Sequence, residues 1–267
     1  MPMIYNVIII GASKEGLGLA KDLSKQNPAL KIAIISETLD NIATKYKLDN
    51  ITYVKGTALD LKYLHGAGVV YLNQTTAYFG ENIVVATGEQ AIEDPTLVGN
   101  FVHYSTQDII TSTPVKMAAV VFGKDYNTIN DAIALSRKFK YVYLCDETNK
   151  LETLYQKQIF ARYDNIAYLP RCTIKQYSLS KQGNLESVEL STYETLNCNA
   201  ILVSLGTHPD TDKLQSTFIK KDKNGYIIVD SNGLIPGLDN VYAIGKCTKY
   251  NKKTTQAVLN MLKNKLK

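Results

Sequence analysis

The feature that most constrains the fold of this chain is an unbroken apolar run near its start that ends in a glycine turn. The run is Val7–Ile10, Gly11 follows it, and a helical spacing of apolar residues begins after Gly16. A second apolar run, Ile32–Ile35, ends just before Glu37. A strand, a glycine turn, a helix, a second strand and an acidic residue, in that order, indicate a dinucleotide-binding βαβ unit.

Each position in this pattern has a physical role. Gly11 permits the tight turn, the helix N-terminus faces a pyrophosphate, and Glu37 accepts hydrogen bonds from ribose hydroxyls. Ser13 stands where the middle glycine of G-x-G-x-x-G is expected, and Gly16 supplies the third glycine. A small side chain still lets a phosphate approach, and its hydroxyl can donate to it. The alternative is an ordinary strand-turn-helix that binds nothing.

Size and composition fit a globular protein with one large domain or two small ones. The chain has 267 residues, of which 45% are hydrophobic and 21% charged. Its net charge of +5 is mild, and the basic residues cluster late rather than alternating with aromatics, so no nucleic-acid partner is expected. No apolar stretch approaches the roughly 20 residues that span a bilayer, and no basic region precedes the first run. We therefore expect no membrane span and a cytoplasmic location.

The cysteines and histidines do not predict a metal site. The four cysteines are far apart in the sequence, without a C-x-x-C pair, and only three histidines are present. Free thiols are the expected state of Cys145, Cys172, Cys198 and Cys247.

Further apolar runs end at glycines, as parallel strands covered on both faces do. They are Asn82–Ala86, Met117–Phe122 and Ala200–Ser204. The segment 116–145 repeats the strand–glycine–helix–strand order of the opening about 110 residues later, which predicts two nucleotide-binding-type domains. A hairpin is predicted at 173–192, a strand at 226–229, and a terminal amphipathic helix at 254–266 that docks on its own domain.

Together these segments resemble the low-molecular-weight thioredoxin reductases and related two-domain flavoproteins. The resemblance covers nearly the whole chain. It implies an α/β fold with two Rossmann-like, FAD/NAD(P)-binding domains of three-layer ββα/βαβ architecture, the second inserted in the first. The first domain would comprise 1–113 and 207–267, and the second 114–206. The motifs that carry the resemblance are the Gly11 turn, Val84–Gly88, the Gly123 turn, Gly206–Pro209, Asn224–Asp230 and Ile235–Gly245.

In that family the first βαβ unit binds FAD, and the resemblance assigns cofactor contacts here residue by residue. The closing family motif ends in Gly-Asp, whereas Gly245 is followed by Lys246, a reversal of charge that still allows direct contact with phosphate. Tyr63, Tyr71 and Tyr78 are more readily explained by packing than by stacking on a flavin. The positions assigned to FAD are Gly11, Ser13, Gly16, Glu37, Thr87, Gly88, Gly245, Lys246 and Gln256.

The family's second unit binds NAD(P)H, and here it keeps only a weak site at Gly123 and Asp146. Asp125 stands where a second glycine would let the pyrophosphate approach, and its carboxylate repels it. Asp146 and Glu147 follow the next strand, where users of NADPH carry basic residues. Two carboxylates oppose a 2′-phosphate, so NADPH is not expected, while NADH remains possible.

The family's redox-active cysteine pair is missing. Tyr104 and Gln107 occupy the two cysteine positions, and neither forms a thiolate or a mixed disulfide. Reduction of disulfides by the family mechanism is therefore not expected, and no residue is identified as catalytic.

Two functions remain open. One is an FAD-dependent oxidoreductase that passes electrons from the flavin to a small-molecule or protein acceptor. The other is a non-catalytic pseudo-enzyme that serves as a nucleotide-binding or regulatory module. A plain NAD-dependent dehydrogenase lacks a catalytic constellation of histidine, lysine or tyrosine. A homodimer is implied by the resemblance alone.

Overall fold

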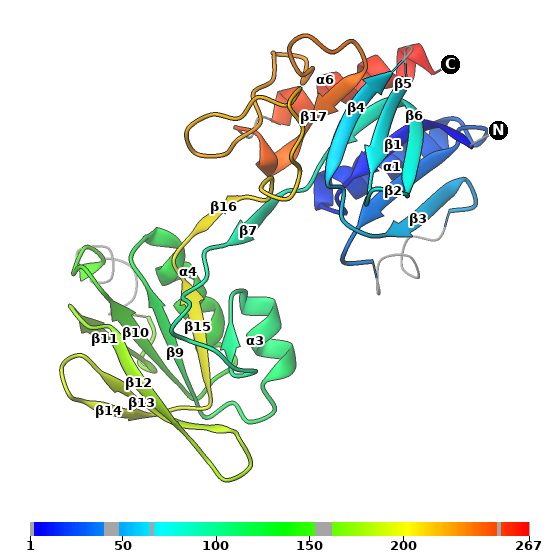
Figure 1. The fold of residues 1–267 in the computed structure, drawn as a ribbon. Coiled ribbons are helices and arrows are strands. Elements are labelled where there is room, and N and C mark those ends of the chain that lie inside the picture. Colours follow the sequence, from blue (N-terminus) through cyan, green and yellow to red (C-terminus); the bar gives the residue numbers. More distant parts are fainter. Residues whose placement is uncertain (1–2, 40–47, 65–66, 153–161, 250–251, 267) are drawn as a thin grey trace. The chain divides into compact units, whose positions relative to one another are not determined.

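The computed structural model describes residues 3–39, 48–64, 67–152, 162–249 and 252–266 (Figure 1). The chain forms two compact units: the first comprises 1–90 and 208–267, and the second comprises 91–207. The boundaries expected from the sequence were 113/114 and 206/207. Two short segments connect the units and pair as a small sheet of their own, β7 (Glu89–Ala91) and β16 (Thr207–Pro209).

The first unit is built on a mixed sheet in the order β3-β2-β1-β6-β5-β4, with β17 beside β6. β1, β2, β3, β6 and β17 run parallel, whereas β4, β5 and β6 form an antiparallel meander. The strands are β1 (Ile4–Ile10), β2 (Ile32–Ser36), β3 (Ile51–Lys55), β4 (Asp60–Leu64), β5 (Ala67–Tyr71), β6 (Ala77–Val85) and β17 (Val241–Ala243).

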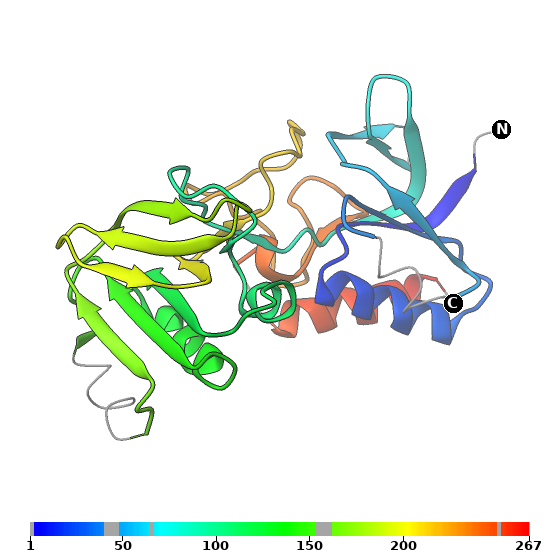
Figure 2. The ribbon, with the colours of Figure 1, turned by 90° about the horizontal axis from the view of Figure 1, so that it is seen from below.

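The central strand β1 is apolar from Val7 to Ile10, because both of its faces are covered there. Val7 and Ile9 pack in one core cluster with α1 (Lys14–Gln26) and α6 (Lys252–Lys265), which lie side by side in Figure 2. Ile8 and Ile10 belong to the cluster on the other face, with residues of β4 and β5 and of the C-terminal loops. This arrangement confirms the buried strands predicted from the apolar runs.

The second unit contains a parallel sheet in the order β11-β10-β9-β15-β8. Its strands are β8 (Val102–His103), β9 (Ala118–Gly123), β10 (Tyr141–Asp146), β11 (Ile166–Pro170) and β15 (Ala200–Ser204). Helices α3 (Thr106–Ser112) and α4 (Tyr126–Ser136) pack on one face. An antiparallel sheet packs on the other face, formed by β12 (Ile174–Leu179), β13 (Leu185–Leu190) and β14 (Thr195–Asn197).

The predicted hairpin is β12–β13, and the predicted terminal helix is α6. The strand predicted at 226–229 is wrong, since Ile227 makes only isolated bridges, to Lys221 and Thr248. The carboxylate of Asp222 accepts the backbone N–H of Tyr226 at 3.1 Å, which holds the chain in a turn there. Thr248 follows the short 3-10 helix η1 (Gly245–Cys247).

Among the described helices, none has both the length and the apolar character needed to cross a bilayer. Within the described ranges, no group of three or more histidine, cysteine, aspartate or glutamate side chains is placed to hold a metal. Tyr63 and Tyr78 pack against the core of the first unit, and the ammonium of Lys62 lies 5.2 Å from the ring centre of Tyr71.

Candidate functional site

The first unit has a cavity of about 530 Å³ at the carboxyl ends of its parallel strands. This edge of an open α/β sheet is where ligands bind, and the volume lies within the range of small-molecule sites. The cavity is lined by segments that follow β1, β2, β3 and β6 and by residues of the C-terminal part: Ile10–Glu15, Ile35–Thr38, Gly56–Ala58, Thr87–Glu89, Asp210, Lys213, Leu214 and Lys246.

Two glycines let α1 start directly against the strand ends. Gly11 has φ +99°, and a Cβ there would lie 2.5 Å from the carbonyl oxygen of Ala86. A Cβ on Gly16 would lie 2.9 Å from the carbonyl oxygen of Gly11. Any side chain at these positions would push the helix start away from the sheet, so both glycines are required by the turn.

The N-terminus of α1 opens onto the cavity. Ser13 is the N-cap residue, and its hydroxyl accepts the N–H of Gly16 at 3.3 Å. Lys14 and Glu15, the next two residues, line the cavity. Gly88, with φ +82°, leaves room in front of Ser13, because a Cβ at Gly88 would lie 3.4 Å from the Cβ of Ser13. A helix N-terminus that faces such a space attracts an anion.

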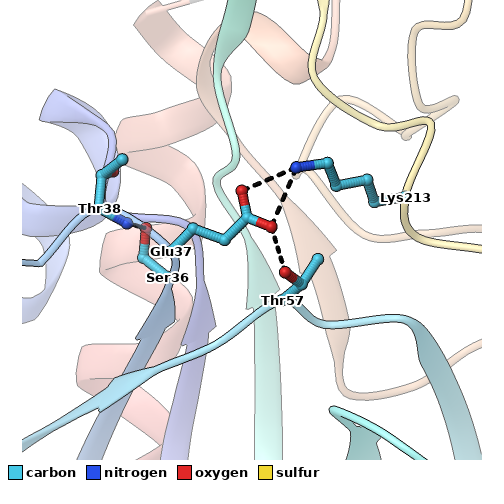
Figure 3. A network of polar contacts seen from close by, with 5 residues as sticks. All are labelled: Ser36, Glu37, Thr38, Thr57 and Lys213. Carbon is cyan, nitrogen blue, oxygen red and sulfur yellow. Dashed lines mark hydrogen bonds and ion pairs between the residues drawn. The ribbon is translucent and has the colours of Figure 1, made fainter.

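Glu37 lies at the cavity in a network of polar contacts (Figure 3). The ammonium of Lys213 donates to both carboxylate oxygens, at 2.7 and 3.0 Å, and the hydroxyl of Thr57 donates to one of them. The hydrogen bond from Lys213, followed by that from Thr57, lowers the pKa of Glu37 below its ordinary value. Glu37 is therefore ionised at neutral pH, and its remaining lone pairs can accept ribose hydroxyls.

Lys213 was not anticipated from the sequence. It lies 176 residues from Glu37 and has no motif around it. The nearby Asp210 also lines the cavity. Burial raises the pKa of Asp210; the charge of Lys213 opposes this rise, and that of Glu37 adds to it. The N–H of Asp210 donates to the carbonyl of Gly88 at 3.1 Å, which ties this segment to the loop after β6.

Lys246, which reverses the charge of the family's aspartate, has an acidic partner. Its ammonium forms an ion pair with Glu89, the residue after Gly88. Gly245, with φ +75°, packs against Glu15, whose nearest side-chain atom would lie 3.2 Å from a Cβ at Gly245. Lysine in place of the expected aspartate therefore occurs together with an acidic residue beside it.

The structure gathers most of the predicted cofactor positions in one place. Gly11, Ser13, Glu37, Thr87, Gly88 and Lys246 line the cavity. Gly16 and Gly245 pack against residues of its wall. Gln256 is not among the lining residues: it is exposed on α6, and its amide donates to Asn260 at 3.1 Å.

In the second βαβ unit, a side chain of the unit itself accepts the free amides at the start of the helix. Asp125 is the N-cap of α4, and its carboxylate accepts the N–H groups of Asn127 and Thr128 at 2.9 and 3.2 Å. The hydroxyl of Thr128 accepts the N–H of Asp125 and donates to the carbonyl of Ser204. This is a capping box, in which the side chains at the N-cap and at the third helical position each accept the other's backbone N–H. Gly123 is enclosed as well, since a Cβ there would lie 2.3 Å from the carbonyl oxygen of Ser204.

Asp146 is fully buried at the end of β10. Its carboxylate accepts the N–H of Thr148 at 2.9 Å, the N–H of Leu151 at 2.8 Å and the hydroxyl of Tyr168 at 2.8 Å. These bonds hold the turn after the strand. The Asp146 side chain, assigned from the sequence to a weak second nucleotide site, therefore serves the interior of the second unit.

Tyr104 and Gln107 flank the start of α3. Tyr104 follows β8 and is half-buried, and burial, with the charge of Glu93, raises its pKa. Gln107 is exposed in the first turn of α3, which Ser105 caps by accepting the N–H of Asp108 at 3.1 Å. All four cysteines of the chain are buried free thiols, away from these two positions in the sequence.

The sequence matches the family model described as pyridine nucleotide-disulphide oxidoreductase over residues 5–261. The chain belongs to this family. No curated protein sequence matches this one. Its fold is similar to that of the thioredoxin reductase of T. acidophilum, with a TM-score of 0.73, 18% identity and 99% of each chain covered. It is also similar to the thioredoxin reductase of Lactococcus lactis, with a TM-score of 0.69, 14% identity, and 97% of this chain and 95% of that one covered.

These matches confirm the family resemblance and the α/β fold with Rossmann-type domains. Family membership implies FAD and a pyridine nucleotide as the group's cofactors. The two βαβ units differ in how they suit such ligands: in the first, Gly11, Ser13 and Gly88 leave the helix N-terminus open to a cavity. In the second, Asp125 occupies the equivalent amides.

Proposed function

We propose that this protein is an FAD-dependent oxidoreductase that works without a redox-active cysteine pair. The observation that carries the proposal is the cavity of the first unit, where the open N-terminus of α1 and the ionised Glu37 line one space. An anion-binding helix start and a ribose acceptor that line one cavity suit the ADP part of a dinucleotide. Bound FAD would supply the hydride and electron transfer chemistry.

The residues of the first unit then have separate tasks. The first turn of α1 and the hydroxyl of Ser13 bind the pyrophosphate, and Glu37 accepts the hydroxyls of the adenosine ribose. Lys213 lowers the pKa of Glu37 and holds its carboxylate in place. Lys246 lines the same cavity in an ion pair with Glu89, and its ammonium would be available to a phosphate when that ion pair opens.

The electron route differs from that of a disulfide reductase. Tyr104 and Gln107 offer no thiol, so the acceptor is a small molecule or a protein that takes electrons from the flavin directly. The second unit is at best a weak site for NADH, because Asp125 fills the helix start. NADPH is disfavoured further by Glu147, the exposed acidic residue directly after β10.

A second candidate is a non-catalytic nucleotide-binding or regulatory module of the same fold. The self-capped start of α4 favours it, because a scaffold that no longer takes an electron donor has no route to reduce its flavin. In both candidates we propose a homodimer located in the cytoplasm, as the family resemblance implies; sedimentation of the purified protein would test the dimer.

The absorbance spectrum of the purified protein, followed by titration with FAD, tests the proposal. Uptake of FAD with reduction of the flavin by NADH supports the oxidoreductase, whereas uptake without reduction by either pyridine nucleotide supports the module. A colourless protein that takes up no added FAD overturns both assignments of FAD.

A matched pair of variants locates the site. Gly16→Ala places a Cβ 2.9 Å from the carbonyl oxygen of Gly11 and should reduce FAD affinity by about tenfold or more. Gly18→Ala makes the same change two residues on, where no atom lies within 4 Å of the added Cβ, and should leave affinity unchanged. Equal affinities for the two variants would place the FAD elsewhere.

A further inference from the structure

Two buried cysteines of the second unit lie against one another at the end of neighbouring strands. Cys145 is the penultimate residue of β10, and Cys172 comes two residues after β11, the strand that pairs with β10 (Figure 1). Their side chains are 0% and 1% exposed, and both belong to the core cluster between the parallel and antiparallel sheets. Nothing in the proposed function uses either thiol.

The backbone brings Cys172 back onto β10. Arg171 has φ +53°, a left-handed conformation that reverses the chain immediately before Cys172. The N–H of Cys172 then donates to the carbonyl of Asp146 at 3.2 Å. Its sulfur lies 3.2 Å from the carbonyl oxygen of Leu169, the residue directly opposite Cys145 in the strand register. Both anchors place the Cys172 side chain beside Cys145.

The two thiols also influence each other's ionisation, because hydrogen bonding with Cys145 lowers the pKa of Cys172. The same bond, together with burial, raises the pKa of Cys145. A pair of this kind has one sulfur that ionises more readily and a neighbour that keeps its proton. Cys198, in the same cluster, has no such partner, and burial raises its pKa to about 12.

We propose that Cys145 and Cys172 are a redox-active dithiol, which a small two-electron oxidant such as hydrogen peroxide converts to a disulfide within the second unit. The Cys172 thiolate attacks one peroxide oxygen, the O–O bond breaks and hydroxide leaves, which forms a sulfenic acid. The Cys145 sulfur then attacks the Cys172 sulfur, the S–O bond breaks, and water leaves with the proton of Cys145. Two thiols are oxidised and one peroxide is reduced to two waters.

The bond would tie the end of β10 to the segment that follows β11. It closes a loop over the chain between residues 145 and 172, and a closed loop stabilises the folded state against the unfolded one. The oxidised second unit therefore unfolds at a higher temperature than the reduced one. A dithiol reductant reverses the change.

Thiol counting on the intact chain tests this proposal without any variant. The reduced protein, treated with a modest excess of hydrogen peroxide and then unfolded in guanidinium, should show a fall from four free thiols to two. Its mass should decrease by two hydrogen atoms, and peptide mapping should recover the cross-link between the Cys145 and Cys172 peptides. Four remaining thiols, added oxygen atoms, or a cross-link to Cys198 would each overturn the proposal.

Variants provide the matched controls. Cys172→Ala should retain all of its remaining thiols under the same treatment, and its melting temperature should not respond to peroxide. Cys247→Ala removes an equally buried thiol from the first unit and should still lose two thiols and still gain stability. If the Cys247→Ala protein behaved like Cys172→Ala, the pairing would be wrong.

Discussion

The two βαβ units of this protein share one order of elements and differ in what their polar groups bind. In the first unit, the hydroxyl of Ser13 caps a single amide, and Glu37 stays at a cavity. In the second, the carboxylate of Asp125 caps two amides, and Asp146 is buried and accepts hydrogen bonds from Thr148, Leu151 and Tyr168. The comparison shows that the fold alone does not make a nucleotide site: the helix start and the acidic residue must also be left available to a ligand.

The difference in ligand binding follows from the N-cap residue of each helix, which is a serine in the first unit and an aspartate in the second. A serine hydroxyl is neutral and satisfies part of the helix N-terminus, so the partial positive charge remains for an anion. An aspartate satisfies more of it and brings the negative charge that a pyrophosphate would otherwise supply. The second unit thus replaces the ligand with its own side chain.

Replacing the acidic residue at the end of each unit's second strand should reveal the largest difference in stability effect between the two units. Asp146→Ala leaves the N–H of Leu151 and the hydroxyl of Tyr168 without their buried acceptor, and should lower the free energy of unfolding by about 3 kcal/mol. Glu37→Ala breaks an ion pair whose side chains are half exposed and should change it by less than about 1 kcal/mol. Denaturant unfolding measures both. Equal losses would mean that the two acids have the same structural role.

Exchanging the helix caps should transfer the binding properties. Ser13→Asp keeps a good N-cap but places a carboxylate at the pyrophosphate position, so FAD affinity should fall by about 30-fold, which corresponds to about 2 kcal/mol. Asp125→Ser should preserve the start of α4 and produce measurable ADP binding by the second unit. Calorimetric titration of each variant checks this exchange. An unchanged affinity in Ser13→Asp would contradict an anion site at α1.

The ion pair at the cavity offers a smaller test. Glu89→Gln leaves the ammonium of Lys246 without its carboxylate partner, so FAD affinity should rise by about fivefold, or about 1 kcal/mol, and become more sensitive to salt. Lys246→Gln, the matched change on the other partner, should lower affinity. Titrations at two salt concentrations would show this, and a rise in both variants would mean that the lysine does not contact the ligand.

The smallest effect is expected at an exposed glycine of α1. Gly18→Ala adds a methyl group where nothing lies within 4 Å and should raise the free energy of unfolding by about 0.5–1 kcal/mol, because alanine loses less conformational entropy in a helix. The same substitution at Gly16 should destabilise the protein. Thermal unfolding of the two variants makes the comparison, and stabilisation by both would show that the start of α1 tolerates a side chain.

Local patterns were sufficient to predict the scaffold. Buried parallel strands are covered on both faces, so runs such as Val7–Ile10 and Ala200–Ser204 are recognisable from their composition alone. The glycine turn at Gly11 was equally readable, because its conformation excludes other residues. The strand expected at 226–229 does not form, because the Asp222 side chain accepts a backbone N–H that a strand would use. An apolar sequence pattern does not reveal this competition.

Contacts between distant segments limited the prediction of the site. Lys213 reaches Glu37 across 176 residues, and the burial of Asp146 depends on Tyr168 from the next strand. Neither contact leaves a trace in the local sequence. The capping role of Asp125 was readable from its spacing to Thr128, but the carboxylate was interpreted only through its charge.

The capping box of α4 also bears on how the protein responds to cofactor supply. A helix that satisfies its own first turn gains nothing from a nucleotide, so protease resistance in the second unit should be the same at every FAD concentration. The first unit leaves that interaction to its ligand, and its lifetime against proteolysis should lengthen as FAD accumulates. Within one polypeptide, the rate of proteolysis of the first unit would then depend on the FAD concentration, whereas that of the second unit would not.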